Sequence, residues 1–176
     1  MKKYYSVFTI ALTAMALMLM PQIADAQSQE GDVKLGVGLA YGSGVGFGSL
    51  DNDLGIRVDG YYGLTNDIRL GGDFTFYLPK SENNVDLTVW ELGLNGNYLF
   101  VNESDLIVYA LAGINITGVS MDFGNGSSSS SEMGLNLGGG VEYDLDFADL
   151  FGELKLAGLG GDADQFTIGA GLRFPL

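Results

Sequence analysis

The sequence predicts an all-β protein, an eight-stranded antiparallel up-and-down transmembrane β-barrel, on three observations. An N-terminal segment has the composition of a secretory signal peptide, the rest of the chain alternates apolar with polar or small residues, and short connectors alternate with longer ones. Alternation at a period of two gives a strand one apolar and one polar face. A sheet whose apolar face meets lipid must close on itself, because lipid offers no water to satisfy unpaired edge N–H and C=O groups.

The first 26 residues predict a signal peptide, and residues 27–176 a single barrel domain. Two lysines precede the apolar run Val7–Met20, which is shorter than the roughly 20 residues that cross a bilayer as a helix. Ala24 and Ala26 match the A-x-A pattern of a signal-peptidase site. We therefore expect cleavage after Ala26.

The first four predicted strands each oppose apolar residues to charged, polar or small ones. The first opposes Val, Leu and Tyr to a lysine and small residues, and the second opposes Ile, Val and Tyr to Arg57 and Asp59. The third opposes Phe and Leu to Arg69 and Asp73, and the fourth opposes Trp, Leu, Tyr and Phe to Glu91 and two asparagines. These strands are Asp32–Ser43, Leu54–Leu64, Ile68–Leu78 and Val85–Phe100.

The last four predicted strands follow the same rule with one exception. The fifth, Leu106–Gly118, is apolar on both faces, so which face points inward stays open. The sixth opposes Met, Leu and Val to Glu142, the seventh opposes Leu to Glu153 and Lys155, and the eighth opposes Phe, Ile and Leu to Arg173 and glycines. The last three strands are Glu132–Tyr143, Ala148–Gly158 and Phe166–Phe174.

Connector lengths give an independent indication of a membrane barrel. Membrane barrels have tight turns at one end and longer loops at the other. The third long connector, Val119–Ser131, ends in five serines, and this composition predicts a mobile loop. The short connectors are Thr65–Asp67, Val101–Asp105 and Asp144–Phe147, and the longer ones are Gly44–Asp53, Pro79–Asn84, Val119–Ser131 and Leu159–Gln165.

The polar faces of the strands predict a network of ion pairs inside the barrel. Eight strands enclose a lumen just wide enough for side chains to fill. Basic and acidic groups in such a lumen must pair, because an unpaired buried charge costs several kcal/mol. Glycines on the same faces leave room for long side chains. The predicted structural network comprises Arg57, Asp59, Arg69, Asp73, Glu91, Glu142, Glu153, Lys155 and Arg173.

Composition excludes several kinds of function. The chain has no Cys and no His, so it cannot form thiolate or imidazole metal sites or a Ser-His-Asp triad. Its net charge of −14 and lack of a basic stripe argue against nucleic acid. Catalytic carboxylate pairs, Asp59 with Glu91 or Glu142 with Glu153, are conceivable, but such pairs among Arg and Lys are more often structural. We expect no enzyme activity, no metal and no cofactor.

These features together resemble a known family. The signal peptide, the eight strands, the first strand K-L-G-V-G-L-A-Y and the closing F-T-I-G-A-G-L-R-F are similar to the small outer-membrane β-barrel proteins of the OmpA/OmpX type, including porin-family-like barrels of Gram-negative bacteria. The resemblance implies a terminal signal read by the barrel assembly machinery, although Pro175-Leu176 depart from its pattern by following the last aromatic residue. The signal residues would be Phe166, Ile168, Leu172 and Phe174.

The resemblance also implies a function. It indicates a monomeric, non-enzymatic integral protein of the bacterial outer membrane, in contact with membrane lipid and lipopolysaccharide, that acts in envelope structure or in surface-loop-mediated binding and adhesion. Acidic outer loops suggest a cation-bridged contact with lipopolysaccharide. Two alternatives remain open, a soluble secreted lipocalin-like barrel that binds an apolar ligand and a narrow ion or small-solute channel. The lipocalin-like barrel requires the opposite facing, with apolar side chains inward.

Overall fold

Strands form all the regular secondary structure in the described part of this computed structural model, which comprises residues 28–43, 52–82, 85–124, 126–161 and 164–176. The predicted signal peptide, including Ala24 and Ala26, lies outside the described residues, as do residues 44–51 of the first long connector. The strands are β1 (Val33–Ser43), β2 (Asn52–Gly63), β3 (Ile68–Tyr77), β4 (Lys80–Glu82), β5 (Val85–Asn102), β6 (Leu106–Asp122), β7 (Ser127–Asp144), β8 (Asp149–Leu159) and β9 (Gln165–Pro175).

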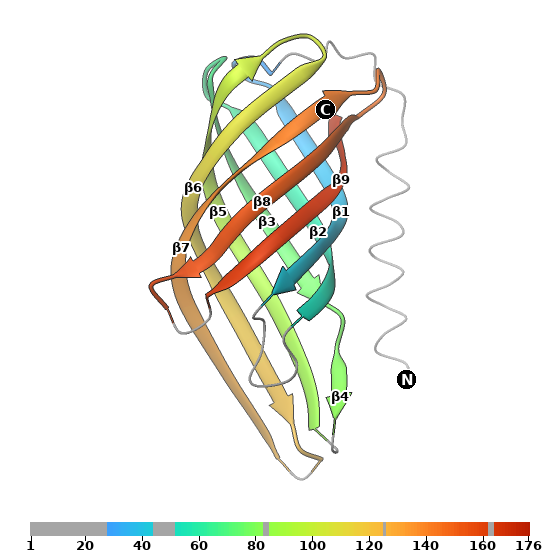
Figure 1. Ribbon diagram of the computed structural model, residues 1–176, viewed down its shortest axis with the longest axis vertical. Helices are drawn as coiled ribbons and strands as arrows, with labels where there is room; N and C mark the ends of the chain where they lie inside the picture. Colours follow the sequence, from blue (N-terminus) through green and yellow to red (C-terminus); the bar gives the residue numbers. More distant parts are fainter. Residues whose placement is uncertain (1–27, 44–51, 83–84, 125, 162–163) are drawn as a thin grey trace.

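The strands close into a barrel (Figure 1). Each strand pairs antiparallel with its neighbours in the order β3-β2-β1-β9-β8-β7-β6-β5, and a pairing of β3 with β5 completes the ring. The first and last strands meet, with Val37 opposite Leu172. Three-residue β4 lies outside this ring and pairs only with the start of β5. The predicted eight-stranded antiparallel barrel is therefore confirmed, with β4 as an additional strand that the alternation did not predict.

Apolar side chains face outward and charged side chains face inward. Leu92 on β5 is 48% exposed and Ile168 on β9 is 44% exposed, whereas Arg57 on β2 is 1% exposed and Glu153 on β8 is 2% exposed. A soluble barrel requires the reverse, because water must meet its polar face. This facing is incompatible with the lipocalin-like alternative.

The open question about the fifth predicted strand is answered by β6. Ile107, Tyr109 and Leu111 are buried inside the barrel, whereas Leu106 and Ile114 are exposed on its outside. These residues pack with Leu99 of β5, and Asn115 and Thr117 are buried on the same face further along the strand. Alternation could not identify the inner face of this strand, since both of its faces are apolar.

Two strands extend into the segment predicted to be a mobile loop, and that prediction is wrong. β6 continues to Asp122 and β7 begins at Ser127, so Ser127–Ser131 pair with Gly118–Asp122. Val119 and Met121 pack their side chains against buried apolar residues of β5, which stabilises the extended hairpin. The serine run suggested a loop by composition, but strand preference depends strongly on what the neighbouring strand offers.

The two ends of the barrel differ. At one end, the short-turn end, β1 begins, β9 ends, and three short turns join β2 to β3, β5 to β6 and β7 to β8. The other, the long-loop end, lies at the bottom of Figure 1 and carries β4 and the tip of the β6–β7 hairpin. No helix in the described part of the chain has the length and apolar character needed to cross a membrane.

Candidate functional site

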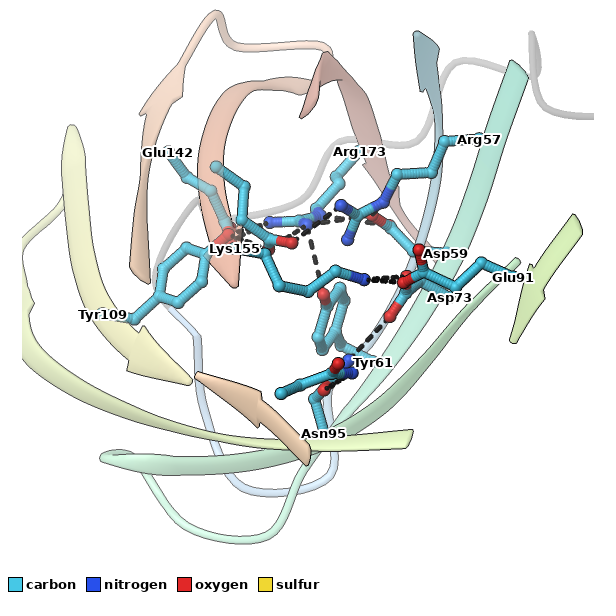
Figure 2. A network of polar contacts seen from close by, with 12 residues as sticks. Arg57, Asp59, Tyr61, Asp73, Glu91, Asn95, Tyr109, Glu142, Lys155 and Arg173 are labelled. Carbon is cyan, nitrogen blue, oxygen red and sulfur yellow. Dashed lines mark hydrogen bonds and ion pairs between the residues drawn. The ribbon is translucent and has the colours of Figure 1, made fainter. Parts of the chain in front are cut away.

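Arg173 on β9 is the centre of the charged interior (Figure 2). Its guanidinium donates to Asp59 at 2.9 and 3.1 Å and to Glu142 at 2.5 Å, and lies 3.6 Å from Glu153. The hydroxyls of Tyr61 and Tyr109 accept two further hydrogen bonds, each at 3.2 Å. One cation on the last strand therefore connects carboxylates on β2, β7 and β8.

The two other arginines bind the same carboxylates from different strands. Arg57 donates to Glu153 at 2.7 Å, and its Nε lies 3.2 Å from Asp59. Arg69 forms a two-pronged contact with Glu142, one bond of which is 3.1 Å. Such forked pairing fixes orientation as well as charge. The three arginines and three carboxylates therefore form one connected cluster.

Aromatic rings support this cluster. The Arg69 guanidinium lies 4.5 Å from the ring centroid of Tyr61 and 4.7 Å from that of Tyr109, and Arg173 lies 4.0 Å from that of Phe151. These distances permit cation–π attraction, which is stronger where water is excluded. The rings therefore replace water on the guanidinium faces.

Lys155 on β8 holds a second group of side chains nearer the long-loop end. Its ammonium donates to Asp73 at 2.8 Å and to Glu91 at 2.6 Å. Amides satisfy the remaining carboxylate oxygens, with Asn95 donating to Asp73 at 2.6 Å and Gln165 donating to Glu91 at 2.5 Å. A buried ammonium between two carboxylates needs such additional donors, because each carboxylate has more acceptor sites than one cation can fill.

Sequence reasoning missed one carboxylate and one amide of the polar interior. Asp149 lies 2.6 Å from the ammonium of Lys34, and Gln165 binds Glu91 as described. Asp149 was placed near the start of a predicted strand and Gln165 in a connector, where alternation gives little information. Asp149 lies four residues before the inward-facing Glu153, and Gln165 lies two residues before the inward-facing Thr167. Extending the alternation by these steps would have placed both side chains inside the barrel.

Charges nearly balance in the interior. Five of the six basic residues in 27–176 lie there, together with six carboxylates. The carboxylate pairs considered for catalysis each bind cations: Asp59 binds Arg173, Glu91 binds Lys155, and Glu142 and Glu153 share Arg173. Among the described residues, no group of three or more potential metal ligands occurs. The buried charged residues are Lys34, Arg57, Asp59, Arg69, Asp73, Glu91, Glu142, Asp149, Glu153, Lys155 and Arg173.

Apolar clusters accompany the charges toward both ends. At the long-loop end, Leu87 and Val89 of β5 pack with Tyr77, Val119 and Met121. Toward the short-turn end, the cluster of Leu99, Ile107, Tyr109 and Leu111 lies on one side of the lumen. Buried apolar side chains therefore lie on both sides of the ionic cluster along the barrel.

Glycine makes room for the network where strands approach it closely. A Cβ on Gly36 of β1 would overlap the Asp59 carboxylate and lie 2.9 Å from Cγ of Arg173. A Cβ on Gly71 of β3 would overlap the Tyr61 ring. The glycines predicted to leave space for long side chains do so at these two positions.

A second feature is a sheet that extends past the barrel wall at the long-loop end. β5, β6 and β7 have 18, 17 and 18 residues, whereas β1, β2, β3, β8 and β9 have 10 to 12. We call the extension the projecting sheet; it consists of β4, Val85–Val89, Gly118–Asp122 and Ser127–Met133. β8 pairs with β7 only from Leu135 onward. Within the described residues, Ser127–Ser131 therefore forms strand pairs on one side only, with β6.

Backbone groups at this free edge can be assigned from the hairpin register. The N–H of Phe123 donates to the carbonyl of Gly126 at 2.9 Å. Hydrogen-bonded and non-hydrogen-bonded pairs alternate along an antiparallel ladder. Ser128 and Ser130 accordingly bond to β6, while the N–H and C=O of residues 127, 129 and 131 point away from the sheet.

The predicted terminal signal lies on the outside of the last strand. Phe166 and Ile168 are exposed, and Leu172 and Phe174 are partly exposed on the same face of β9. Their role in assembly stays a prediction.

Comparisons with known proteins agree with this architecture. Residues 9–174 match the family model described as outer membrane protein beta-barrel domain. No curated protein matches the chain.

Similar solved structures share the fold at low sequence identity. One is Ail, the attachment invasion locus protein of Yersinia pestis, in complex with the heparin analogue sucrose octasulfate. Its sequence identity to this chain is 20% and the TM-score is 0.61; the match covers 83% of this chain and 100% of the Ail chain. The N-terminal barrel of Pseudomonas aeruginosa OprF is 18% identical with a TM-score of 0.61, covering 85% and 100%. Neisserial surface protein A is 22% identical with a TM-score of 0.62, covering 81% and 95%. The chain therefore belongs to the outer membrane protein β-barrel domain family, and it is a protein of the bacterial outer membrane.

Proposed function

We propose that this protein is a non-enzymatic outer-membrane anchor that holds the projecting sheet outside the cell as a binding surface. The observation that carries the proposal is the edge of β7 at Ser127–Ser131, which pairs with β6 alone among the described strands, on strands longer than a membrane crossing requires. The long-loop end faces outward in this proposal, since membrane barrels place their short turns in the periplasm. The first 26 residues act as the signal peptide that exports the chain.

The charged interior supports a structural role for the barrel. Each of the six buried carboxylates binds a cation within 3.7 Å, so no described interior carboxylate is left to act as a free general base. Aromatic and apolar side chains occupy the remaining lumen on either side of the ionic cluster. We therefore favour a rigid, filled barrel over a channel or an enzyme.

The free edge suits recognition by strand addition. An extended partner can form main-chain hydrogen bonds with an exposed sheet edge, and its affinity then comes from the backbone. Proteins usually protect long edges with charges or proline. Ser127–Ser131 has neither, which leaves the edge open for pairing.

Charge narrows the range of partners. The sequence of the long connectors and of the strand ends beside them contains eight acidic residues against a single basic residue, Lys80. A sulfated polyanion of the kind bound in the Ail structure would be repelled by this surface. A contact with anionic lipopolysaccharide would need bridging divalent cations, and chelation should then weaken it. The acidic residues are Asp51, Asp53, Glu82, Asp86, Asp122, Glu132, Asp162 and Asp164.

Proline at the edge tests the proposal. The S129P/S131P variant removes two edge N–H donors without removing those that bond to β6, and proline is tolerated at sheet edges. Each main-chain hydrogen bond contributes about 0.5–1.5 kcal/mol, so adhesion should fall about tenfold. Adhesion of bacteria that display the protein to a layer of cultured animal cells is the measurement. The matched S129T/S131T variant keeps both donors and should adhere like the parent protein; equal adhesion of the proline variant would refute the proposal.

A further inference from the structure

We infer that an open apolar groove on the outside of β6–β9 binds one acyl chain of an aminophospholipid, with its ammonium group beside acidic turns at the short-turn end. The groove encloses about 800 Å³, within the range of about 300–1,000 Å³ typical of ligand sites. This inference rests on the outer-membrane location and is independent of the β7 edge.

Small residues form the floor of the groove. Gly139 on β7, Gly152 on β8 and Ala170 on β9 line it, and Gly152 lies directly opposite Ala170. All three belong to the outward face of the barrel, where the neighbouring positions carry large apolar side chains. Missing side chains on three adjacent strands therefore make a depression in a wall that is otherwise covered with Leu, Ile and Phe.

The groove walls select hydrocarbon. Leu137 is 50% exposed, and Leu154 and Ile168 contribute large exposed side chains along the sides. Because lipid surrounds the barrel on every side, transfer from water does not drive binding, and van der Waals packing must do so. A depression gives a single acyl chain contacts on several sides, whereas a convex wall contacts it on one side only.

Acidic turns near the groove select the headgroup of the bound lipid. Val141 and Val108 line the groove, and each lies three residues, or about 10 Å along the strand, from an acidic residue of a short turn. Asp144 ends β7 and Asp146 follows it, Glu103 and Asp105 precede β6, and the Asp144 N–H donates to the Asp105 carbonyl at 3.1 Å. No lysine or arginine occurs in either turn. Such a surface attracts an ammonium headgroup and repels a purely anionic one.

Native mass spectrometry of the detergent-solubilised protein tests the inference. The protein is mixed with equal amounts of phosphatidylethanolamine and phosphatidylglycerol that carry identical acyl chains. Gly152→Leu fills the groove, and the position of its added Cβ lies 3.9 Å from the nearest neighbouring atom, a methyl of Val141. Gly96→Leu on β5 is the matched control, since it is also an outward glycine, with 3.7 Å to the nearest atom, but does not line the groove.

The wild-type protein and Gly96→Leu should each retain one phosphatidylethanolamine in preference to phosphatidylglycerol. Gly152→Leu should lower that retention about tenfold, because the leucine side chain takes the space in which the acyl chain would pack. The D144N/D146N variant keeps Glu103 and Asp105, so it should still retain lipid but with a weaker headgroup preference, whereas Asp67→Asn, in a different short turn, should keep the full preference. Equal retention by Gly152→Leu and Gly96→Leu, or no lipid on the wild-type protein, overturns the groove. A wild-type protein without headgroup preference overturns the role of the turns.

Discussion

Replacing Arg173 with methionine should lower the free energy of unfolding by about 3–5 kcal/mol, because it leaves Asp59, Glu142 and Glu153 without a shared cation. Arg173 is fully buried, so water cannot solvate the carboxylates that it leaves behind. Urea titration of the protein folded in lipid vesicles measures the change. Trp90, the single tryptophan, lies on the outward face of β5 and reports unfolding by its fluorescence.

Two further variants identify the cause of that loss. Arg173→Lys keeps the charge but loses the planar fork that contacts two carboxylates and two tyrosine hydroxyls, so its loss should be smaller than that of Arg173→Met. Adding Asp59→Asn to Arg173→Met removes one uncompensated charge and should recover part of the stability. A loss below about 1 kcal/mol for Arg173→Met would mean that the ion pairs do not hold the barrel together.

An arginine at Leu94 should be the most harmful substitution on the outer wall. Leu94 lies in the middle of β5 and is 66% exposed, so its side chain meets the hydrocarbon core. Arginine on the lipid face costs about 2–4 kcal/mol at the bilayer midplane and about 0–1 kcal/mol near the interfaces. The same urea titration in lipid vesicles measures the loss.

Leu106→Arg is the matched control for depth. Leu106 is also an exposed leucine on the outward face, but it is the first residue of β6, beside the turn that follows β5. It should lose at least about 1 kcal/mol less stability than Leu94→Arg. Equal losses of stability at both positions would show that Leu94 lies no deeper in the bilayer than Leu106.

Alternation predicted most of the barrel because the bilayer imposes it. Strands such as β3 and β9 have lipid on one side and ion pairs on the other. An apolar residue in them therefore predicts an outward side chain, and a charged residue predicts an inward one. Arg57, Arg69 and Arg173 could be placed inside from sequence for this reason. Which carboxylate each arginine binds could not, because partners such as Arg57 and Glu153 lie on β2 and β8, 96 residues apart, and their contact depends on the register of the whole ring.

Three features escaped prediction because they depend on neighbouring strands. The extension of β6 places Val119 and Met121 against Leu87 and Val89 of β5. The buried apolar residues of β6 pack with Leu99 of β5, a contact that the sequence of β6 alone does not contain. The outer groove arises where Gly139, Gly152 and Ala170 lie on the outward face of three adjacent strands, an arrangement that the sequence of a single strand does not contain.

Conductance of the purified protein in planar lipid bilayers tests the central claim, that ion-paired and apolar side chains fill the barrel from end to end. We expect the ion pairs of Lys155 and Arg173 and the apolar cluster around Leu87 to leave no hydrated path along the lumen. The bilayer should therefore stay silent at protein levels where a sixteen-stranded porin gives clear steps. Stable single-channel steps that grow with salt concentration would contradict a filled lumen.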